Sequence, residues 1–108
     1  MITIDELHKI EIKIGTILSA VNVPKSEKLL QLSVDFGEDV PRQIISGISM
    51  YVSDAEEIIG KQFAFVTNIE PRTIFSLESN GMLFAVGEGD SFAFLTPHHP
   101  VSPGTSAH

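Results

Sequence analysis

Residues 11–23 read EIKIGTILSAVNV, and this stretch decides the fold class of the chain. Isoleucines alternate with Glu11 and Lys13, which is the two-residue period of a half-buried strand. Gly15 interrupts the pattern, and apolar residues then continue to Val23. A glycine inside so long a strand indicates a bulge or a bend of a barrel. We therefore expect one long, bent first strand.

Further strands follow from the same kind of pattern. Apolar runs between turn signals predict five more strand segments, at residues 30–36, 41–45, 61–67, 82–86 and 92–95. Residues 37–39 read as a hairpin turn, whereas residues 68–80 are expected to be mostly loop.

Two capping-box patterns predict short helices. The first, Thr3–Glu6, begins a helix over residues 4–8. The second, Ser53–Glu56, begins a helix over residues 54–59, and Gly60 follows where a C-terminal cap is expected.

This order of elements predicts an all-β, five-stranded Greek-key barrel of the oligonucleotide-binding type, or OB-fold, with short helices. A β-sandwich is the second choice because it needs more strands and regular turn spacing. The chain is expected to be one domain over residues 1–108, with a barrel at 1–87 and a C-terminal extension at 88–108. Apolar surface at Phe92 and Phe94 in this extension must be covered, which favours dimerisation through it.

Composition limits the classes of function. The chain has 108 residues, of which 43% are hydrophobic and 19% charged, as in a packed soluble domain. It has no cysteine, which excludes a disulfide framework and a cysteine nucleophile.

No apolar run is long enough to span a membrane and no signal peptide is present, so we expect no membrane partner and a cytoplasmic location. The start at Met1 favours a free-standing protein. The net charge of −7 counts against nucleic-acid binding unless the cations gather locally.

No motif for catalysis is present. The chain lacks a glycine-rich phosphate loop, a nucleophile elbow and a nucleophile–base pair. His98 and His99 are adjacent in a proline-rich tail, where neighbouring side chains point to opposite sides and chelate a metal poorly. We expect no enzyme activity, no cofactor and no metal site.

The basic residues are more informative. Lys13 lies on the polar face of the first strand, Lys28 beside the first turn, and Arg42 at the start of the third strand. Arg72 lies in the loop after the fourth strand. Such residues can converge on the face of strands two and three and on the adjoining loops, the usual nucleic-acid surface of the fold. Scattered solubilising charge explains them equally well.

Three uncharged side chains fit the same surface. Asn68 and Ser79 are suited to contacts with base edges and phosphates, and Met82 at a pocket rim would pack on a splayed base. The alternative is that Asn68 and Ser79 satisfy backbone groups of the loops.

Five segments resemble, in order and spacing, the tRNA-binding domain at the C-terminus of methionyl-tRNA synthetases. Similar domains occur in β-subunit-like proteins, in endothelial monocyte-activating polypeptide and in free-standing tRNA-binding and secretion-chaperone-like proteins. The segments are IKIGTI at 12–17, SEKLL at 26–30, RQIISGI at 42–48, NIEPR at 68–72 and ESNGM at 78–82. The resemblance implies an OB-fold and a non-catalytic homodimer that grips the tRNA elbow by shape. It further implies that this dimer assists a methionyl-tRNA synthetase in cis or in trans.

The resemblance also assigns residues. It implies phosphate contacts by four cations and a nucleotide pocket lined by three further side chains: Lys13, Lys28, Arg42 and Arg72, then Asn68, Ser79 and Met82. Residues 73–76 carry no charge, although family members usually have Lys or Arg there. This supports an alternative, a protein-interaction or chaperone-like dimer that has lost strong RNA binding and offers Ile74 and Phe75 to an extended polypeptide.

Overall fold

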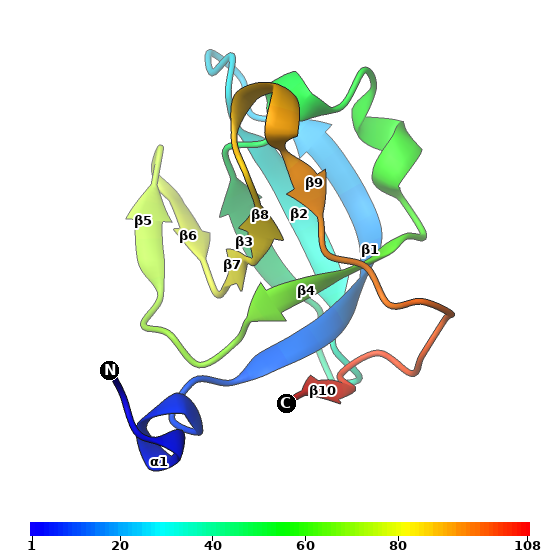
Figure 1. Ribbon diagram of the computed structural model, residues 1–108. Coiled ribbons are helices and arrows are strands. Elements are labelled where there is room, and N and C mark those ends of the chain that lie inside the picture. Colours follow the sequence, from blue (N-terminus) through cyan, green and yellow to red (C-terminus); the bar gives the residue numbers. More distant parts are fainter.

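In the computed structural model, which describes residues 1–108, the longest strand joins the two halves of a barrel (Figure 1). β1 (Ile12–Asn22) pairs antiparallel with β4 (Gln62–Val66) through its first half and with β2 (Leu30–Asp35) through its second half. β2 also pairs with β3 (Arg42–Ser46). One long strand therefore serves both sides, as the alternation at residues 11–23 predicts.

The bend of β1 depends on Gly15. A Cβ atom there would lie 2.4 Å from Val34 Cγ1 and 2.6 Å from the Phe36 ring, so no side chain fits where the strand crosses the core. The expected bend is confirmed. The bulge lies further along, because the register with β2 shifts between Ile17 and Ser19.

Two contacts bring the ends of the sheet together. β7 (Met82–Leu83) extends the sheet beyond β4. On the far side of β3, the amide of Asn80 donates to the Gln43 carbonyl at 2.8 Å. The barrel is nearly closed, and the prediction of an all-β, five-stranded OB-fold barrel with short helices is confirmed.

The core consists of the inward-facing residues of these strands. Phe65 is fully buried and meets Phe36 edge to face, with ring centroids 5.4 Å apart. Along β2, buried and half-buried residues alternate without exception. Along β4, in contrast, Phe63, Ala64, Phe65 and Val66 are all buried, because other parts of the chain cover its second face.

The prediction of loop over residues 68–80 is wrong. This segment contains a hairpin of β5 (Arg72–Ile74) and β6 (Leu77–Ser79). Its turn has only two residues, Phe75 and Ser76, with φ of 54° and 66°. Two left-handed residues are typical of the tightest hairpin turn, whose usual sequence is Asn-Gly. The sequence does not predict this hairpin, because Phe-Ser differs from the Asn-Gly sequence that is typical of such a turn.

The first predicted helix is confirmed and the second is partly wrong. α1 (Ile4–Leu7) begins with the Thr3 capping box. The segment after β3 forms two 3-10 turns, η1 (Ser49–Tyr51) and η2 (Ala55–Ile58). The cap of η2 is Asp54, whose carboxylate accepts from the Glu56 amide at 3.0 Å, and not Ser53.

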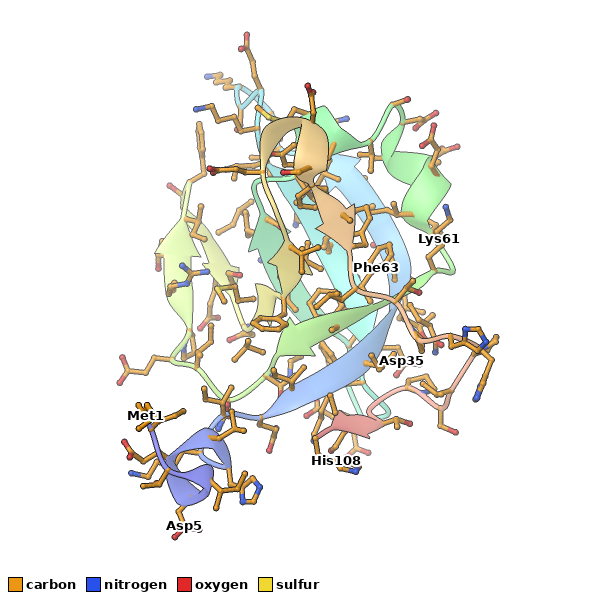
Figure 2. All side chains as sticks on the ribbon, viewed as in Figure 1. Met1, Asp5, Asp35, Lys61, Phe63 and His108 are labelled. Atoms are coloured by element: carbon orange, nitrogen blue, oxygen red, sulfur yellow. The ribbon has the colours of Figure 1, made fainter.

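The C-terminal extension folds back on the barrel. The apolar run at 82–86 splits into β7 and β8 (Ala85–Val86), and β8 pairs with β9 (Ala93–Phe94) after the 3-10 turn η3 (Gly89–Ser91). The last strand, β10 (Ser106–Ala107), pairs with the start of β1. Both termini, marked by Met1 and His108, lie at the lower end of the molecule (Figure 2).

Aromatic side chains of the extension are covered within the chain. The Phe92 ring stacks on Tyr51 at 4.0 Å, and the Phe94 ring stacks on Phe63 at 4.1 Å. The apolar surface that suggested a dimer is thus partly buried in a single chain. No helix of this structure has the length and apolar character needed to cross a membrane.

Candidate nucleic-acid interface

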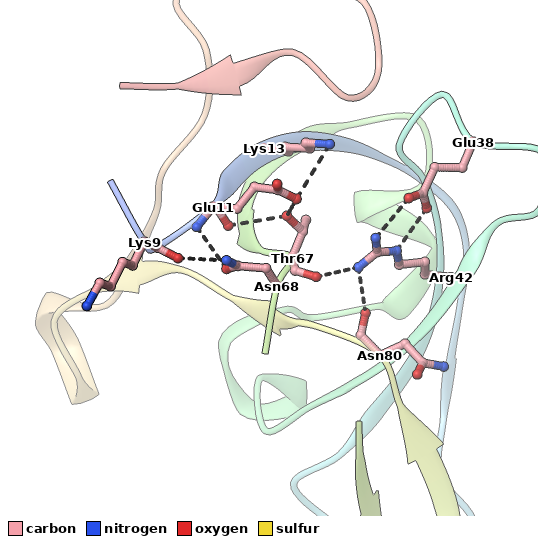
Figure 3. Close-up of polar contacts among 8 residues, drawn as sticks. All are labelled: Lys9, Glu11, Lys13, Glu38, Arg42, Thr67, Asn68 and Asn80. Carbon is pink, nitrogen blue, oxygen red and sulfur yellow. Dashed lines mark hydrogen bonds and ion pairs between the residues drawn. The ribbon is translucent and has the colours of Figure 1, made fainter. Parts of the chain in front are cut away.

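Arg42 is held by contacts inside the protein. Its Nε and Nη2 atoms donate to the two carboxylate oxygens of Glu38, each at 2.8 Å (Figure 3). Nη1 donates to the Thr67 carbonyl at 2.6 Å and to the Asn80 carbonyl at 3.4 Å. The guanidinium carbon also lies 5.4 Å from the centroid of the Phe36 ring. Arg42 therefore ties the start of β3 to the ends of β4 and β6.

Lys13 and Asn68 belong to the same network (Figure 3). Lys13 Nζ lies 3.5 Å from Glu11 Oε1, and the Thr67 hydroxyl donates to that same oxygen at 2.7 Å. The Asn68 side chain accepts from the Glu11 amide at 2.8 Å and donates to the Lys9 carbonyl at 2.7 Å. The hydrogen bonds of Asn68 thus connect the segment before β1 with the segment after β4.

We call this network the Arg42 cluster. Its members are Glu11, Lys13, Glu38, Arg42, Thr67, Asn68 and Asn80. Two cations face two carboxylates, so the cluster has no net charge. Hydrogen bonding from Thr67 lowers the pKa of Glu11, helped by the nearby Lys13 charge. Hydrogen bonds from Arg42 lower the pKa of Glu38, and Glu38 in turn raises the pKa of Arg42. Both pairs are therefore charged at neutral pH.

Ser79 is not accessible in this structure. The residue is only 1% exposed. Its hydroxyl accepts from the Ile45 amide at 3.0 Å and donates to the Gly81 carbonyl at 3.2 Å. Ser79 and Asn68 both satisfy backbone groups of loops, which is the second of the two interpretations that the sequence leaves open.

Lys28 lies at the other end of β2 from Arg42. Leu30 pairs with Ser46, whereas Val34 pairs with Arg42. Lys28 precedes the start of β2, and Leu30 lies four residues before Val34, so at ~3.3 Å per residue about 13 Å of strand separates the two ends. The seven residues proposed from the sequence therefore do not form a single patch. Arg72, at the start of β5, and Met82, on β7, are exposed between these two ends.

The tip of the β5–β6 hairpin lies at the same end as Lys28. The Ile45 amide bonds to Ser79 and the Gln43 carbonyl to the Asn80 amide, so β6 runs antiparallel to β3. The hairpin tip therefore points toward Ser46, the end of β3 where the β1–β2 loop also lies, and Figure 1 shows both at the upper end of the barrel.

We call this region the loop end and define it by Lys25, Lys28, Phe75 and Ser76. Both lysines are exposed and neither forms an ion pair, since the two ion pairs of the protein involve Lys13 and Arg42. The Phe75 side chain is 54% exposed. The sequence prediction omitted Lys25 and Phe75 from the RNA-binding set, although two lysines flanking one turn are a visible signal.

Unusual backbone conformations gather at the loop end. Only three residues other than glycine have positive φ, and they are Lys25 at 67°, Phe75 at 54° and Ser76 at 66°. Such conformations are costly for side chains of this size and are often found at ligand sites.

A small OB-fold barrel with exposed cations and an aromatic ring on its loops belongs to the class of binding domains. The chain matches the family described as "Putative tRNA binding domain" over residues 12–106, and it belongs to this family.

Relatives and solved structures agree with this assignment. The methionine–tRNA ligase of Methanoregula boonei is 48% identical over 105 residues, and that of Methanospirillum hungatei is 49% identical over 104 residues. These stretches cover 97% and 96% of this chain, which spans only 15% of the length of each ligase.

Two crystal structures share the fold over the whole chain. A MetRS-related protein from Pyrococcus horikoshii has a TM-score of 0.90 and 31% identity, and 98% of that protein is covered. The chaperone CsaA from Bacillus anthracis has a TM-score of 0.87 and 25% identity, and 99% of it is covered.

Proposed function

We propose that this domain is a non-catalytic tRNA-binding module of the cytoplasm, selective for the shape of the tRNA elbow. It acts as a homodimer and assists aminoacylation by a methionyl-tRNA synthetase, either as part of the same chain or as a separate subunit. The observation that carries the proposal is the family match over residues 12–106, together with the synthetase relatives.

Charge distribution supports binding despite the net charge of −7. At 0.15 M salt, exposed charges more than about 8 Å apart are largely screened, so a local set of free cations can still bind phosphate. Lys25, Lys28 and Arg72 are exposed and free of ion pairs. We assign them the phosphate contacts and assign Met82 a contact beside the nucleotide.

The remaining proposed residues act through the loops they hold. Arg42 and Asn68 join the starts of β3 and β1 to the end of β4, Lys13 pairs with Glu11 in the same network, and Ser79 joins β6 to β3. They position the strands that carry the RNA-binding loops.

The dimer contact in this proposal combines the C-terminal extension with the N-terminal segment. Ile2, Ile4, Leu7 and Ile10 are all exposed. Because Ile12 pairs with Ala107, the chain that leads from this apolar segment into β1 reaches the last strand of the extension. Light scattering, which measures the mass of the protein in solution, tests this dimer contact. Wild-type protein is expected to have twice the mass of one chain, whereas the Ile4→Glu/Leu7→Glu variant is expected to have the mass of a single chain. A wild-type monomer at micromolar concentration would exclude the dimer.

The binding proposal is tested by fluorescence-anisotropy titration of tRNA at low and physiological salt. Saturable binding is expected, and Lys25→Ala/Lys28→Ala should reduce the salt slope by roughly two, one for each lost phosphate contact. The matched control is Lys61→Ala/Lys9→Ala, because this variant also removes two exposed lysines but neither belongs to the loop end. Figure 2 shows Lys61 on the opposite side of the molecule from the β5–β6 hairpin. Absence of tRNA binding at low salt would contradict the proposal.

A second candidate is a chaperone-like, protein-binding dimer. The observation that favours it is the likeness to CsaA, together with the exposed apolar side chain of Phe75 in a loop without charges. It predicts binding to unfolded polypeptide and none to tRNA, and the same titration with a reduced, unfolded client protein separates the two functions.

A further inference from the structure

We propose that the loop end is a stacking site for an unpaired nucleobase, with Phe75 as the platform and Lys25 and Lys28 as contacts to the adjoining phosphates. This rests on the proposed tRNA-binding function and adds which feature of tRNA is recognised here. That feature is a base turned out of its helix, in addition to the shape of the folded RNA.

The first argument is the isolation of the Phe75 ring. Five of the seven phenylalanines pair with another aromatic ring inside the protein, and these are Phe36, Phe63, Phe65, Phe92 and Phe94. Phe75 has no ring partner and is 54% exposed. Phe84 is the other unpaired ring and is 40% exposed. Phe75 thus lies outside the hydrophobic core, and about half of the residue is open to solvent.

The second argument is the backbone that carries the ring. Phe75 and Ser76 form the whole turn of the hairpin, and both are left-handed. Asn-Gly would adopt this turn without strain, whereas a phenylalanine there is disfavoured. A two-residue turn also fixes the backbone that carries the ring, so little backbone order is lost when a base stacks on it.

The third argument is the charge beside the ring. Lys25 and Lys28 lie at the same end of β3 and have no ion-pair partners. Glu27 stands between them and Glu78 lies on the hairpin, so the electrostatic attraction for RNA is modest. Base–aromatic stacking tolerates any sequence and adds roughly tenfold or more in affinity for each base. A hairpin tip at the same end of the barrel as two free cations suits a base and its phosphates better than a polypeptide, which is usually held in a groove or along a strand edge.

The experiment uses a single-stranded RNA of ten nucleotides with one 2-aminopurine, its fully paired duplex, and whole tRNA. Wild-type protein is expected to quench the 2-aminopurine fluorescence of the single strand and to bind it more tightly than the duplex. Phe75→Leu should abolish the quenching and weaken single-strand binding about tenfold, whereas Phe75→Trp should retain both. Phe84→Leu is the matched control and should behave as wild type.

The outcomes separate this proposal from the function on which it rests. Wild-type binding of tRNA without quenching of the single strand, or unchanged quenching in Phe75→Leu, overturns the stacking site and leaves tRNA binding intact. Failure to bind any RNA overturns both. If Phe75→Leu instead loses affinity only for an unfolded polypeptide, the ring is a protein contact and the stacking site is wrong. Because Phe75 is exposed, its variants should melt within a few degrees of wild type, which circular dichroism checks.

Discussion

The Arg42 cluster and the loop end both carry cations of one barrel, on strands in the first region and on a loop in the second, and the surroundings of these cations are opposite. In the cluster, Arg42 and Lys13 each face a carboxylate, and Arg42 also binds two carbonyls. At the loop end, Lys25 and Lys28 are exposed without an ion-pair partner, at the same end of the barrel as an unpaired aromatic ring. The difference shows how the role of a basic residue in a nucleic-acid-binding fold depends on its hydrogen-bond donors. The residue stabilises the fold when its donors are bonded within the protein, and it is available to RNA when they are not.

Removal of the Arg42 side chain should have the largest effect. Arg42→Ala leaves the Thr67 and Asn80 carbonyls and the Glu38 carboxylate without their donor. We expect the free energy of unfolding in urea to fall by about 2–3 kcal/mol. Arg72→Ala, at an exposed position, should change it by less than about 0.5 kcal/mol. At a temperature where Arg42→Ala is fully folded, its tRNA affinity should stay within about twofold of wild type. A tenfold loss would instead make Arg42 a phosphate contact.

Ser79→Ala should have the next largest effect. The substitution leaves the buried Ile45 amide without an acceptor, which costs about 1–2 kcal/mol of unfolding free energy. Thermal unfolding by circular dichroism measures the loss. Thr73→Ala, an exposed position on the same hairpin, is the control and should be nearly neutral. Equal stability of Ser79→Ala and wild type would show that the hydroxyl does not hold β6 to β3.

The hairpin turn offers a test with opposite effects on stability and binding. Phe75→Asn/Ser76→Gly replaces two strained residues by the preferred sequence for this turn, so the unfolding free energy should rise by about 1 kcal/mol. The same variant should bind tRNA more weakly because the platform is lost. Ser76→Gly alone keeps the ring and should be stabilised without loss of affinity. A double variant that is less stable than wild type would contradict the assignment of strain to this turn.

The smallest effect concerns pH. The pKa of Glu38 and of Glu11 is lowered in the folded state, so these pairs stabilise the protein above the unfolded pKa of about 4.5 and cease to do so as pH falls below it. The Glu11 and Glu38 side chains are 45% and 40% exposed, so solvent screens both ion pairs and each contributes only about 0.5 kcal/mol. Glu38→Gln should therefore be slightly less stable at pH 7, and the difference from wild type should shrink as pH falls through the lowered pKa of Glu38, as measured by urea unfolding. Glu70→Gln, at an exposed carboxylate outside both ion pairs, should show no such convergence.

Local patterns account for most of the fold that the sequence predicts. The alternation in β1 and β2 and the capping box at Thr3 are read over a few residues, and each is confirmed. The missed elements lack their usual signal. The β5–β6 hairpin turns on Phe-Ser, and β10 has only two residues, whereas β7, β8 and β9 lie within the strand segments predicted at 82–86 and 92–95.

The candidate site was only partly predictable. Glu38 lies four residues before Arg42 and Glu11 two residues before Lys13, so both ion pairs had a visible signal in the sequence. The partners of Asn68 and Ser79 had none, because Asn68 reaches back to Glu11 and Lys9, and Ser79 to Ile45.

The sequence by itself determined an all-β barrel with a long bent first strand, and it determined the family. Side-chain period and turn residues act over short distances, so the chain encodes them locally. Only the tertiary structure decided which cations are free. Strand register brings Arg42 to carbonyls 25 and 38 residues away and leaves Lys25, Lys28 and Phe75 together at the other end of the barrel. Hydrogen-bond donors become occupied only when the strands pair, and that pairing depends on the whole core.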